Sequence, residues 1–592
     1  MSAGDKGPSQ ASQLVSLARA GYDLVMSEDG RPYGVRRNGP HIALPLRGRA
    51  GLRTQLARRF TINNGGQVPS QSALADAMTV LEGEAAAGDP VPVHLRVAGD
   101  ASRVVVDLGT ADGHCVIATP DGWQNADRSP VLFRRSGAMA PMPRPEGTTD
   151  GLALLRDLVN MDDPTFHQLV AWLIAAWIPH IPHPVLTCKG EQGTGKSKAA
   201  QMIVNLVDPS AATKRSQPRD VKAWATQAFN SWALCLDNIS TIPPWLSDTL
   251  CKAVTGDGIV DRALYTDDDV VVLTFRRVLA LTTIDAGALA GDLAERLLVL
   301  DLQLIGEDRR RSEEDLDTAY DTARPAILGA LLDLLVAVLR ELPSVRLERM
   351  PRMADFARVL AAVDHVQGWD TLGSYTAAAQ TVYADALEGD PFGTAVVGFV
   401  ETHGAWSGTA GQLLDLLPPP DGYHPKWPKD APRAGGQLKR LAPMLRSVGI
   451  NYDDTSRTPD RRRQRLISLT PTEMGRKTLS APALLSATTS DQAKPADSTD
   501  ASTVQMLSAH CPQPPAADSA DSADSEADSE AALLSAPPHA SEQANRPPAD
   551  SRASTDSKTH AISGPHLICP VCEQPMAPEL TTVGHLIHPN CQ

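Results

Sequence analysis

Apolar and polar residues follow two different periods along the chain, and their alternation predicts the order of its structural elements. Between about residues 149 and 305, segments with helical spacing alternate with short apolar runs, which is typical of an α/β sheet. Helical spacing over residues 151–160 and 164–177 precedes a first strand at 185–188. A longer helical region follows at 314–340, where Leu and Ala recur three and four residues apart.

The first 148 residues contain shorter periodic segments. Helical spacing is present over residues 13–22, and the β-rich runs that follow are separated by turns containing Gly and Asp. We therefore expect an N-terminal mixed α/β region. Its predicted strands are 92–97, 103–108, 115–119 and 131–135.

Residues 390–475 have the pattern of a compact domain made of helices and a hairpin. Helices are predicted over 406–417 and 434–448, and two strand-like segments, 449–452 and 464–469, flank a basic turn. Helices followed by a two-stranded wing describe a winged helix.

The composition changes abruptly after the hairpin. Residues 481–560 are rich in Ala, Ser, Asp and Pro, so they cannot bury enough apolar surface to fold. The predicted units are an N-terminal mixed α/β accessory domain (1–148), an α/β core (149–310), a helical region (311–389), a winged-helix domain (390–475), a disordered acidic linker (476–562) and a C-terminal segment (563–592).

The net charge of −15 is unevenly distributed over the 592 residues. Residues 481–560 carry 12 acidic and 4 basic side chains, whereas residues 424–477 carry 13 basic and 5 acidic ones. Because a DNA phosphate responds to the local charge, the acidic total does not exclude a nucleic-acid partner.

Membrane insertion and secretion are not expected. No segment offers the ~18 uncharged apolar residues that a membrane-spanning helix needs, and no apolar stretch preceded by positive charge is present at the N-terminus. Eight cysteines in a chain of this length do not suggest a disulfide framework. We therefore expect a cytoplasmic protein.

A glycine-rich segment joins the first predicted strand to a helix predicted over residues 197–207. Its glycines let backbone N–H groups converge on phosphates, and the helix N-terminus adds the positive end of its dipole. Lys196 would reach the outer phosphates, and the Ser197 hydroxyl would ligate Mg²⁺. The pattern predicts that residues 149–310 are a P-loop ATPase core, with an ATP site formed by Gly190, Glu191, Gln192, Gly193, Thr194, Gly195, Lys196 and Ser197.

A second apolar strand, 232–236, ends in a carboxylate. We predict that Asp237 holds Mg²⁺ together with Ser197, as the acid on a neighbouring strand does in P-loop ATPases; a helix-capping role is the alternative. Many such ATPases place a glutamate next, which orients the attacking water. Here Asn238 can hold a water but cannot take its proton, so slow hydrolysis is possible and fast hydrolysis is not assured.

A third strand, 278–281, ends in two threonines, and we assign Thr283 to sensing the γ-phosphate or positioning water. Arg296 is suited to reach the nucleotide of a neighbouring subunit and to stabilise the charge of the transition state. An intrachain salt bridge with Glu295 or Asp292 is the alternative, and the sequence does not decide between the two.

The predicted winged helix is strongly basic on its second helix and in its wing. Five arginines within nine positions repel one another and usually need a polyanion, which favours DNA over a solvated charged face. The predicted DNA-binding residues here are Lys439, Arg440, Arg446, Arg461, Arg462 and Arg463.

The C-terminal residues contain two closely spaced pairs of metal-binding side chains. Three thiolates and one imidazole make a closed tetrahedral Zn²⁺ site of structural type, so residues 563–592 are predicted to form a zinc ribbon. The predicted ligands are Cys569, Cys572, His588 and Cys591, and His585 is a competing fourth ligand.

Taken in this order, the features resemble those of superfamily III helicases and the related poxvirus-type primase–helicases of phages and mobile elements, whose core is an AAA+-like P-loop fold. The most specific piece is residues 253–265, Ala-Val-Thr-Gly-Asp-Gly-Ile-Val-Asp-Arg-Ala-Leu-Tyr. In that family this motif precedes or forms a hairpin that grips single-stranded DNA in the channel of a hexamer. The resemblance implies this role for Arg262 and Tyr265; a surface hairpin with Tyr265 packed beneath it is the alternative.

No paired-carboxylate primase centre is recognisable in the first 150 residues, so the resemblance implies a separate primase or polymerase as partner. The prediction is an ATP-dependent DNA helicase or helicase-like motor, a homo-hexamer that binds single-stranded and duplex DNA in the replication of a phage or mobile element. The alternative is an ATP-switched DNA-binding regulator or loader with little hydrolysis.

Overall fold

The computed structural model describes residues 8–48, 50–262, 270–284, 293–417, 419, 427–459 and 463–472, with the backbone alone at 259–262, 270–274 and 385–386. All of them lie in the first of two compact units, Met1–Pro482. The second unit, Ala483–Gln592, contains most of the predicted acidic linker and the whole predicted zinc ribbon, and both predicted segments lie outside the described residues.

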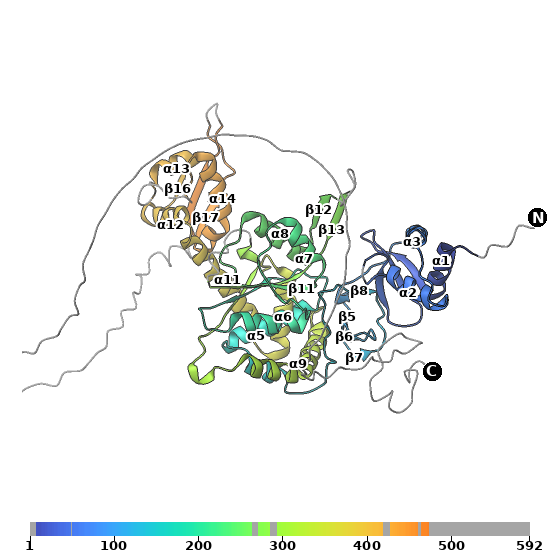
Figure 1. Ribbon diagram of the computed structural model, residues 1–592. Coiled ribbons are helices and arrows are strands. Elements are labelled where there is room, and N and C mark those ends of the chain that lie inside the picture. The colour runs from blue at the N-terminus through green and yellow to red at the C-terminus, as the bar shows by residue number, and fades with distance from the viewer. Residues whose placement is uncertain are drawn as a thin grey trace, which may run out of the picture. The chain divides into compact units, whose positions relative to one another are not determined.

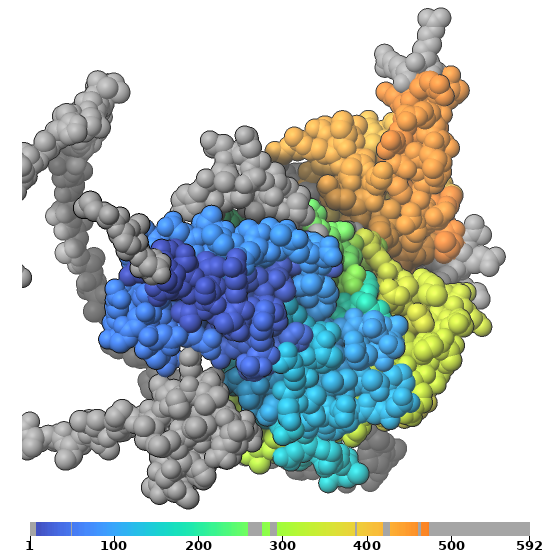
Figure 2. Space-filling model, turned by 90° about the vertical axis from the view of Figure 1, so that its right-hand side faces the viewer, coloured from blue at the N-terminus to red at the C-terminus, as the bar shows by residue number. Residues whose placement is uncertain are grey.

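The N-terminal region packs three helices against one sheet. The Ser9 hydroxyl caps the first helix by accepting from the N–H of Ser12, and Leu14, Leu52 and Phe60 are buried in the shared core. The strands pair in the order β1-β2-β3-β8. The elements are α1 (Gln10–Gly21), β1 (Tyr22–Met26), β2 (Pro32–Arg36), β3 (Ile42–Pro45), α2 (Leu52–Asn63), α3 (Gln71–Ala86) and β8 (Phe133–Arg134). Figure 2 shows these residues, in blue, as a continuous surface beside the cyan residues that follow.

A second, antiparallel sheet follows in the order β4-β5-β6-β7. Its strands are β4 (Val97–Gly99), β5 (Val104–Asp107), β6 (Cys115–Thr119) and β7 (Gly122–Ala126). The predicted strand over 115–119 is confirmed, whereas the one over 92–97 is wrong. Val91 and His94 make only isolated bridges, to Ser27 and Phe133, because Arg96 has a φ of 61° and interrupts the extended chain.

The core is a parallel sheet in the order β10-β11-β14-β9-β15. The three central strands, β11, β14 and β9, are almost completely buried, which explains their continuous apolar runs. Helices α5 and α6 lie in front of it in Figure 1. The elements are α4 (Gly151–Leu158), α5 (Asp163–Ala176), β9 (Val185–Lys189), α6 (Lys196–Val207), β10 (Lys214–Arg215), α7 (Val221–Phe229), β11 (Ala233–Leu236), α8 (Pro244–Thr255), β14 (Val278–Thr283), η2 (Ala294–Arg296) and β15 (Leu297–Asp301).

Two strands outside this sheet form an antiparallel ribbon between α8 and β14. They are β12 (Gly258–Arg262) and β13 (Val270–Thr274), and Gly258 pairs with Thr274 at the base of the ribbon.

Helix α9 (Glu313–Glu341) packs against α4, α5 and β6. Among the described helices it is the one whose length and apolar content would suffice to cross a membrane, and 61% of its apolar window is buried inside the protein. The helical region predicted over residues 314–340 is confirmed by this helix. A short 3-10 turn, η3 (Glu307–Arg309), precedes it, and α10 (Ala354–Gln367) and α11 (Thr371–Glu388) follow it.

The last described region contains α12 (Pro391–His403), β16 (Trp406–Gly408), α13 (Ala410–Leu416), α14 (Ala431–Ser447), β17 (Ile450–Asp453) and β18 (Ile467–Pro471), with sheet order β16-β18-β17. The prediction of one helix over 406–417 is wrong at its start. Residues Trp406–Gly408 pair with β18, and the helix begins only after Thr409, whose side chain forms a capping box with Gln412.

A buried ion pair joins the second sheet to the core sheet. Arg96 is fully buried, and its Nε donates to Oδ1 of Asp208 at 2.7 Å. Oδ2 of Asp208 accepts from the backbone N–H groups of Trp232 (2.7 Å) and Ala233 (3.1 Å) at the start of β11. The guanidinium also donates to carbonyl oxygens of Asp107 and Ala140, at 2.9 and 2.6 Å. Both charges are therefore compensated by hydrogen bonds in the interior.

Removing Arg96 should be strongly destabilising, because it leaves Asp208 charged and only partly compensated. We expect Arg96→Met to lower the free energy of unfolding by about 3–5 kcal/mol. Arg19 is a matched control, since its salt bridge with Glu84 is on the surface and Arg19→Met should cost far less stability than Arg96→Met. Denaturant unfolding followed by tryptophan fluorescence measures both variants, and equal losses would contradict the assigned role of the buried pair.

The buried side chain of His183 should make the stability of the fold depend on pH. Its Nε2 lies 3.0 Å from the carbonyl oxygens of Ala175 and Ile178, and burial lowers the pKa of the ring to about 4. In the unfolded chain the ring takes up its proton near 6.5, so stability is complete above 6.5 and falls as the pH drops towards 4. The loss should be about 3 kcal/mol. In His183→Gln, which cannot titrate, thermal unfolding should lose this part of the pH dependence, and an unchanged profile would refute the assignment.

Candidate phosphate-binding site

The glycine-rich segment predicted to bind phosphate connects β9 to α6, as expected. Gly193 and Gly195 have positive φ angles of 92° and 76°, which a residue with a Cβ adopts only with strain. A Cβ on Gly190 would lie 2.7 Å from Oγ1 of Thr194 and 3.0 Å from the carbonyl oxygen of Leu302. The turn therefore depends on glycine at three positions, and its backbone is fixed from inside by the buried Thr194, whose hydroxyl donates to the carbonyl of Glu191 at 3.0 Å.

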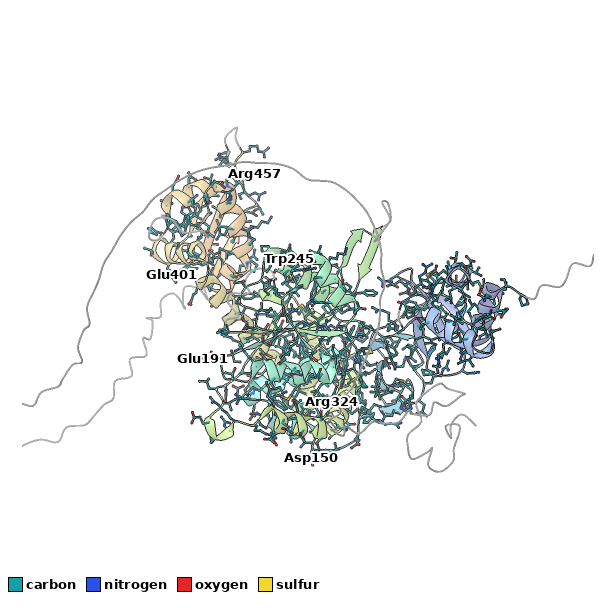
Figure 3. All side chains as sticks on the ribbon, in the orientation of Figure 1. Asp150, Glu191, Trp245, Arg324, Glu401 and Arg457 are labelled. Atoms are coloured by element: carbon teal, nitrogen blue, oxygen red, sulfur yellow. The ribbon has the colours of Figure 1, made fainter. Side chains whose placement is uncertain are left out.

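The N-terminus of α6 is free of a side-chain cap. Helices α1, α3, α5 and α7 each have a Ser or Asp side chain that accepts from their first turn, whereas the N-cap of α6 is Gly195. Lys196 bends back over the loop, and its Nζ donates to the carbonyl of Glu191 at 3.0 Å. Glu191 is exposed at the edge of the core, where Figure 3 labels it. The turn, the uncapped helix and the lysine fit a bound polyphosphate.

Asp237 follows β11 directly and is held by the next strand of the sheet. Its Oδ1 accepts from the hydroxyl of Thr282 at 2.6 Å, and the same hydroxyl accepts from the backbone N–H of Asn238 at 2.7 Å. Because β9, β11 and β14 are parallel, their carboxyl ends reach the same edge of the sheet, where the glycine-rich turn also lies. The carboxylate of Asp237 is thus oriented at the edge that carries Lys196 and Ser197.

Of the two threonines at the end of β14, the hydroxyl of Thr282 contacts Asp237, whereas the sequence assigns the site role to Thr283. The two residues are adjacent in a strand and so point to opposite faces. Both are buried, and Thr283 pairs in register with Lys189 of β9. The pair of threonines at the strand end was the available signal, but only the register of β14 against β11 shows which hydroxyl meets the acid.

Asn238 has a φ of 58°, the left-handed region that asparagine tolerates best among residues with a side chain. This conformation gives a physical reason for asparagine at this position. A glutamate would be strained there.

The strands beneath the site form an apolar layer that contains two thiols. Cys188 and Cys235 are buried, and burial raises the pKa of the Cys188 thiol to about 12, with a smaller contribution from the charge of Asp237. Burial raises the pKa of Cys235 as well. Both thiols therefore stay protonated and serve as packing groups rather than nucleophiles.

Arg296 lies in η2 and is 9% exposed. Its neighbour Glu295 forms a salt bridge with Arg352, so Glu295 is engaged elsewhere. Asp292, the other proposed partner, lies outside the described residues. The role of Arg296 at a neighbouring subunit stays a prediction.

The two residues assigned to gripping single-stranded DNA belong to the β12–β13 ribbon. Arg262 ends β12, where the backbone alone is described, and Tyr265 lies outside the described residues. The ribbon itself agrees with the hairpin that the family resemblance implied.

Basic side chains of the last region gather on α14 and near the β17–β18 hairpin. Lys439, Arg440 and Arg446 are all exposed, while Leu438, Leu441 and Leu445 of the same helix are buried. Arg457 is exposed at the outer end of this hairpin, as Figure 3 shows. Arg463 is described near it, with a φ of 46°, whereas Arg461 and Arg462 lie outside the described residues. The amphipathic helix therefore presents three of the predicted cations to solvent.

The predicted zinc ligands Cys569, Cys572, His588 and Cys591 lie outside the described residues and stay a prediction. Within the described part of the chain, no cluster of three or more His, Cys, Asp or Glu side chains could hold a metal ion.

Comparison with solved structures gives distant similarities. The apo structure of the NrS-1 C-terminal region shares 12% identity at a TM-score of 0.33, covering 67% of this chain and 83% of that one. The X-ray structure of JCV helicase shares 12% identity at a TM-score of 0.22, covering 40% of this chain and 64% of that one. No curated protein matches the sequence.

Two family models match adjacent parts of the chain. Residues 152–385 match the actinomycete integrative conjugative element replication protein, and residues 392–488 match the C-terminal domain of the same replication protein, RepA. The first match contains the glycine-rich turn and Asp237, and the second contains α14. Together the two matches place residues 152–385 and 392–488 with the replication proteins of integrative conjugative elements.

Proposed function

We propose that the protein is an ATP-dependent DNA helicase or helicase-like motor that acts in the replication of an integrative conjugative element. The observation that carries this proposal is the convergence of a glycine-rich turn, an uncapped helix N-terminus and a hydrogen-bonded aspartate at one edge of a parallel sheet. The match to replication proteins of such elements supports the biological setting.

Each group at this edge has a distinct role in the proposal. Residues 190–195 and the first N–H groups of α6 would surround the phosphates, and Lys196 would leave the carbonyl of Glu191 to pair with the outer ones. Ser197 and Asp237 would hold Mg²⁺, which neutralises charge on the phosphates when bound. Thr282 keeps the carboxylate of Asp237 in one orientation by donating to it.

Asn238 is placed next to Asp237 and would position water by hydrogen bonding without removing its proton. Since phosphoryl transfer depends mainly on positioning and electrostatics, turnover is expected to be slow rather than absent. The same residue favours the second candidate function, an ATP-switched DNA-binding regulator or loader. Strand separation that depends on ATP distinguishes the motor from the switch.

The DNA contacts in this proposal come from two regions. The β12–β13 ribbon, with Arg262 and Tyr265, would hold a single strand, and the exposed cations of α14 would bind phosphates of duplex DNA. A homo-hexamer would bring Arg296 to a neighbouring nucleotide. A C-terminal zinc ribbon and a separate primase or polymerase complete the proposal.

The phosphate-loop assignment is tested by Lys196→Ala, which should abolish Mg-ATP binding and DNA-stimulated ATP turnover. Asn238→Asp is a better gain-of-function variant than Asn238→Glu, because aspartate also tolerates the left-handed conformation. We expect Asn238→Asp to raise turnover several-fold if a missing base limits hydrolysis. Steady-state phosphate release with and without single-stranded DNA measures both effects. A native protein that neither binds nor hydrolyses Mg-ATP would refute the proposed function.

The role of Thr282 is tested by comparing Thr282→Ser with Thr282→Val. Serine keeps the hydroxyl that donates to Asp237 and accepts from Asn238, whereas valine keeps the branched shape and removes both hydrogen bonds. We expect Thr282→Val to lower turnover about tenfold or more and Thr282→Ser to stay close to the native rate. If both variants lose activity equally, the shape of the side chain and not its hydroxyl supports the site.

A further inference from the structure

A cavity lies at the edge of the core sheet opposite the glycine-rich turn. It has a volume of about 610 Å³ and is lined by Trp232 and Arg277, which directly precede β11 and β14. Residues of the N-terminal half, including His94 and Arg134, form its other wall. Because the strands are parallel, this cavity is at their amino ends and the phosphate loop is at their carboxyl ends.

Three arginines, Arg134, Arg276 and Arg277, line this cavity. Arg277 is 7% exposed, and its Nε donates to the carbonyl of Ala228 at 2.5 Å. Arg134 donates to the carbonyl of Phe229 at 2.5 Å, also at the C-terminal end of α7. Within the described part of the chain, none of the three forms an ion pair with a carboxylate. The side-chain hydrogen bonds of the three arginines to described residues go to backbone carbonyls.

Arg276 connects the cavity to the base of the β12–β13 ribbon. Its guanidinium donates to the carbonyls of Thr255, at the end of α8, and of Pro179, both at 3.2 Å. The Nε of Arg276 is buried without a hydrogen-bond partner among the described residues. Backbone carbonyls hold the guanidinium of Arg276 at the base of the ribbon, and among the described residues no carboxylate pairs with it.

The acidic side chains at this cavity do not neutralise the arginines. Glu28 and Asp29 are exposed on its rim, and Asp29 pairs with Arg31 at 3.3 Å. Burial is the main cause that lowers the pKa of Arg277 to about 9, and it lowers the pKa of Arg134 and Arg276 as well. An anion in the cavity would reverse this penalty, because it stabilises the charged form of each guanidinium.

We propose that this cavity is a second anion-binding site, which takes the phosphate groups of a nucleic-acid strand or of a free nucleotide through Arg134, Arg276 and Arg277. Its volume is within the usual range of ligand pockets, roughly 300–1,000 Å³. The ring of Phe229 is already contacted by the guanidinium groups of Arg31 and Arg134, each 3.9 Å from the ring centre, which leaves less of it for stacking with a base. Recognition by charge alone fits phosphate rather than base sequence.

The site is tested in the full-length protein by reversing charge at the mouth of the cavity. His180 lines the cavity and is exposed, so His180→Glu adds a negative charge without disturbing the core. His180→Gln is the neutral matched control, and Thr79→Glu places the same charge on an exposed position of α3 outside the cavity. Arg276→Gln removes one proposed phosphate contact. Equal melting temperatures of these variants show that they remain folded.

Two probes distinguish the source of the phosphate. The first is a fluorescent single-stranded oligothymidylate followed by anisotropy, and the second is pyrophosphate followed by calorimetry. Both are measured in a Lys196→Ala background, which removes the phosphate loop as a competing site. We expect His180→Glu to weaken one of the two probes about tenfold relative to both controls. If the strand is the ligand, Arg276→Gln should also reduce the salt dependence by about one phosphate contact.

Loss of oligothymidylate affinity alone assigns the cavity to a nucleic-acid strand, and loss of pyrophosphate affinity alone assigns it to a free nucleotide. Unchanged affinity for both probes overturns the proposal, and the arginines then serve only to cap the C-terminus of α7. Since Lys196 is absent throughout, failure here is distinguishable from failure of the ATPase, which is measured with Lys196 intact.

Discussion

The geometry of the candidate site depends on the carboxylate of Asp208, which lies at the opposite end of the core strands. Asp208 follows α6 directly and accepts backbone N–H groups at the start of β11. Helix α6 begins at the glycine-rich turn, and β11 ends at Asp237, so a single side chain fixes the far ends of both elements that form the site. A carboxylate in the interior is tolerated only when its charge is compensated, and Arg96 supplies that compensation from the second sheet. The N-terminal half is thereby a structural requirement for the geometry of the core and not merely an addition to it.

The near end of the site is fixed by a neutral group. The Thr282 hydroxyl donates to Asp237 and accepts from the N–H of Asn238, which uses both of its hydrogen-bonding capacities. This arrangement draws the chain after β11 into the left-handed turn at Asn238. The residue after the acid is therefore selected by backbone conformation as well as by chemistry. Asparagine satisfies the turn, and the absence of a proton acceptor there follows from the same constraint.

The sequence predicts well those features that depend on local periodicity and on short motifs. The strand–turn–helix around Gly195 and strand β6 are found where the pattern placed them, because the apolar runs and the glycines are local signals. The errors have non-local causes. The pattern predicted a helix over Trp406–Gly408. These residues instead form strand β16, because β18, about sixty residues later, pairs with them. Strand β4 starts late because Arg96, whose guanidinium is buried against Asp208, has a positive φ that interrupts the extended chain, and no pattern of hydrophobicity reveals this. Thr282 was passed over for Thr283 because the choice depends on register against β11.

The two proposed anion sites lie at opposite ends of the same strands. Binding at one site could therefore affect binding at the other only through these strands. Strands β11 and β14 are short and buried along their length, so they can transmit a displacement only by moving as a unit against β9. Two hydrogen bonds would resist such a movement. At one end the backbone N–H of Trp232 donates to Asp208, and at the other end the hydroxyl of Thr282 donates to Asp237. Any coupling must work equally in both directions: if phosphate in the cavity strengthened nucleotide binding, nucleotide would strengthen binding in the cavity by the same factor. Because Trp232 both lines the cavity and donates to Asp208, it is the residue through which such a displacement would have to begin.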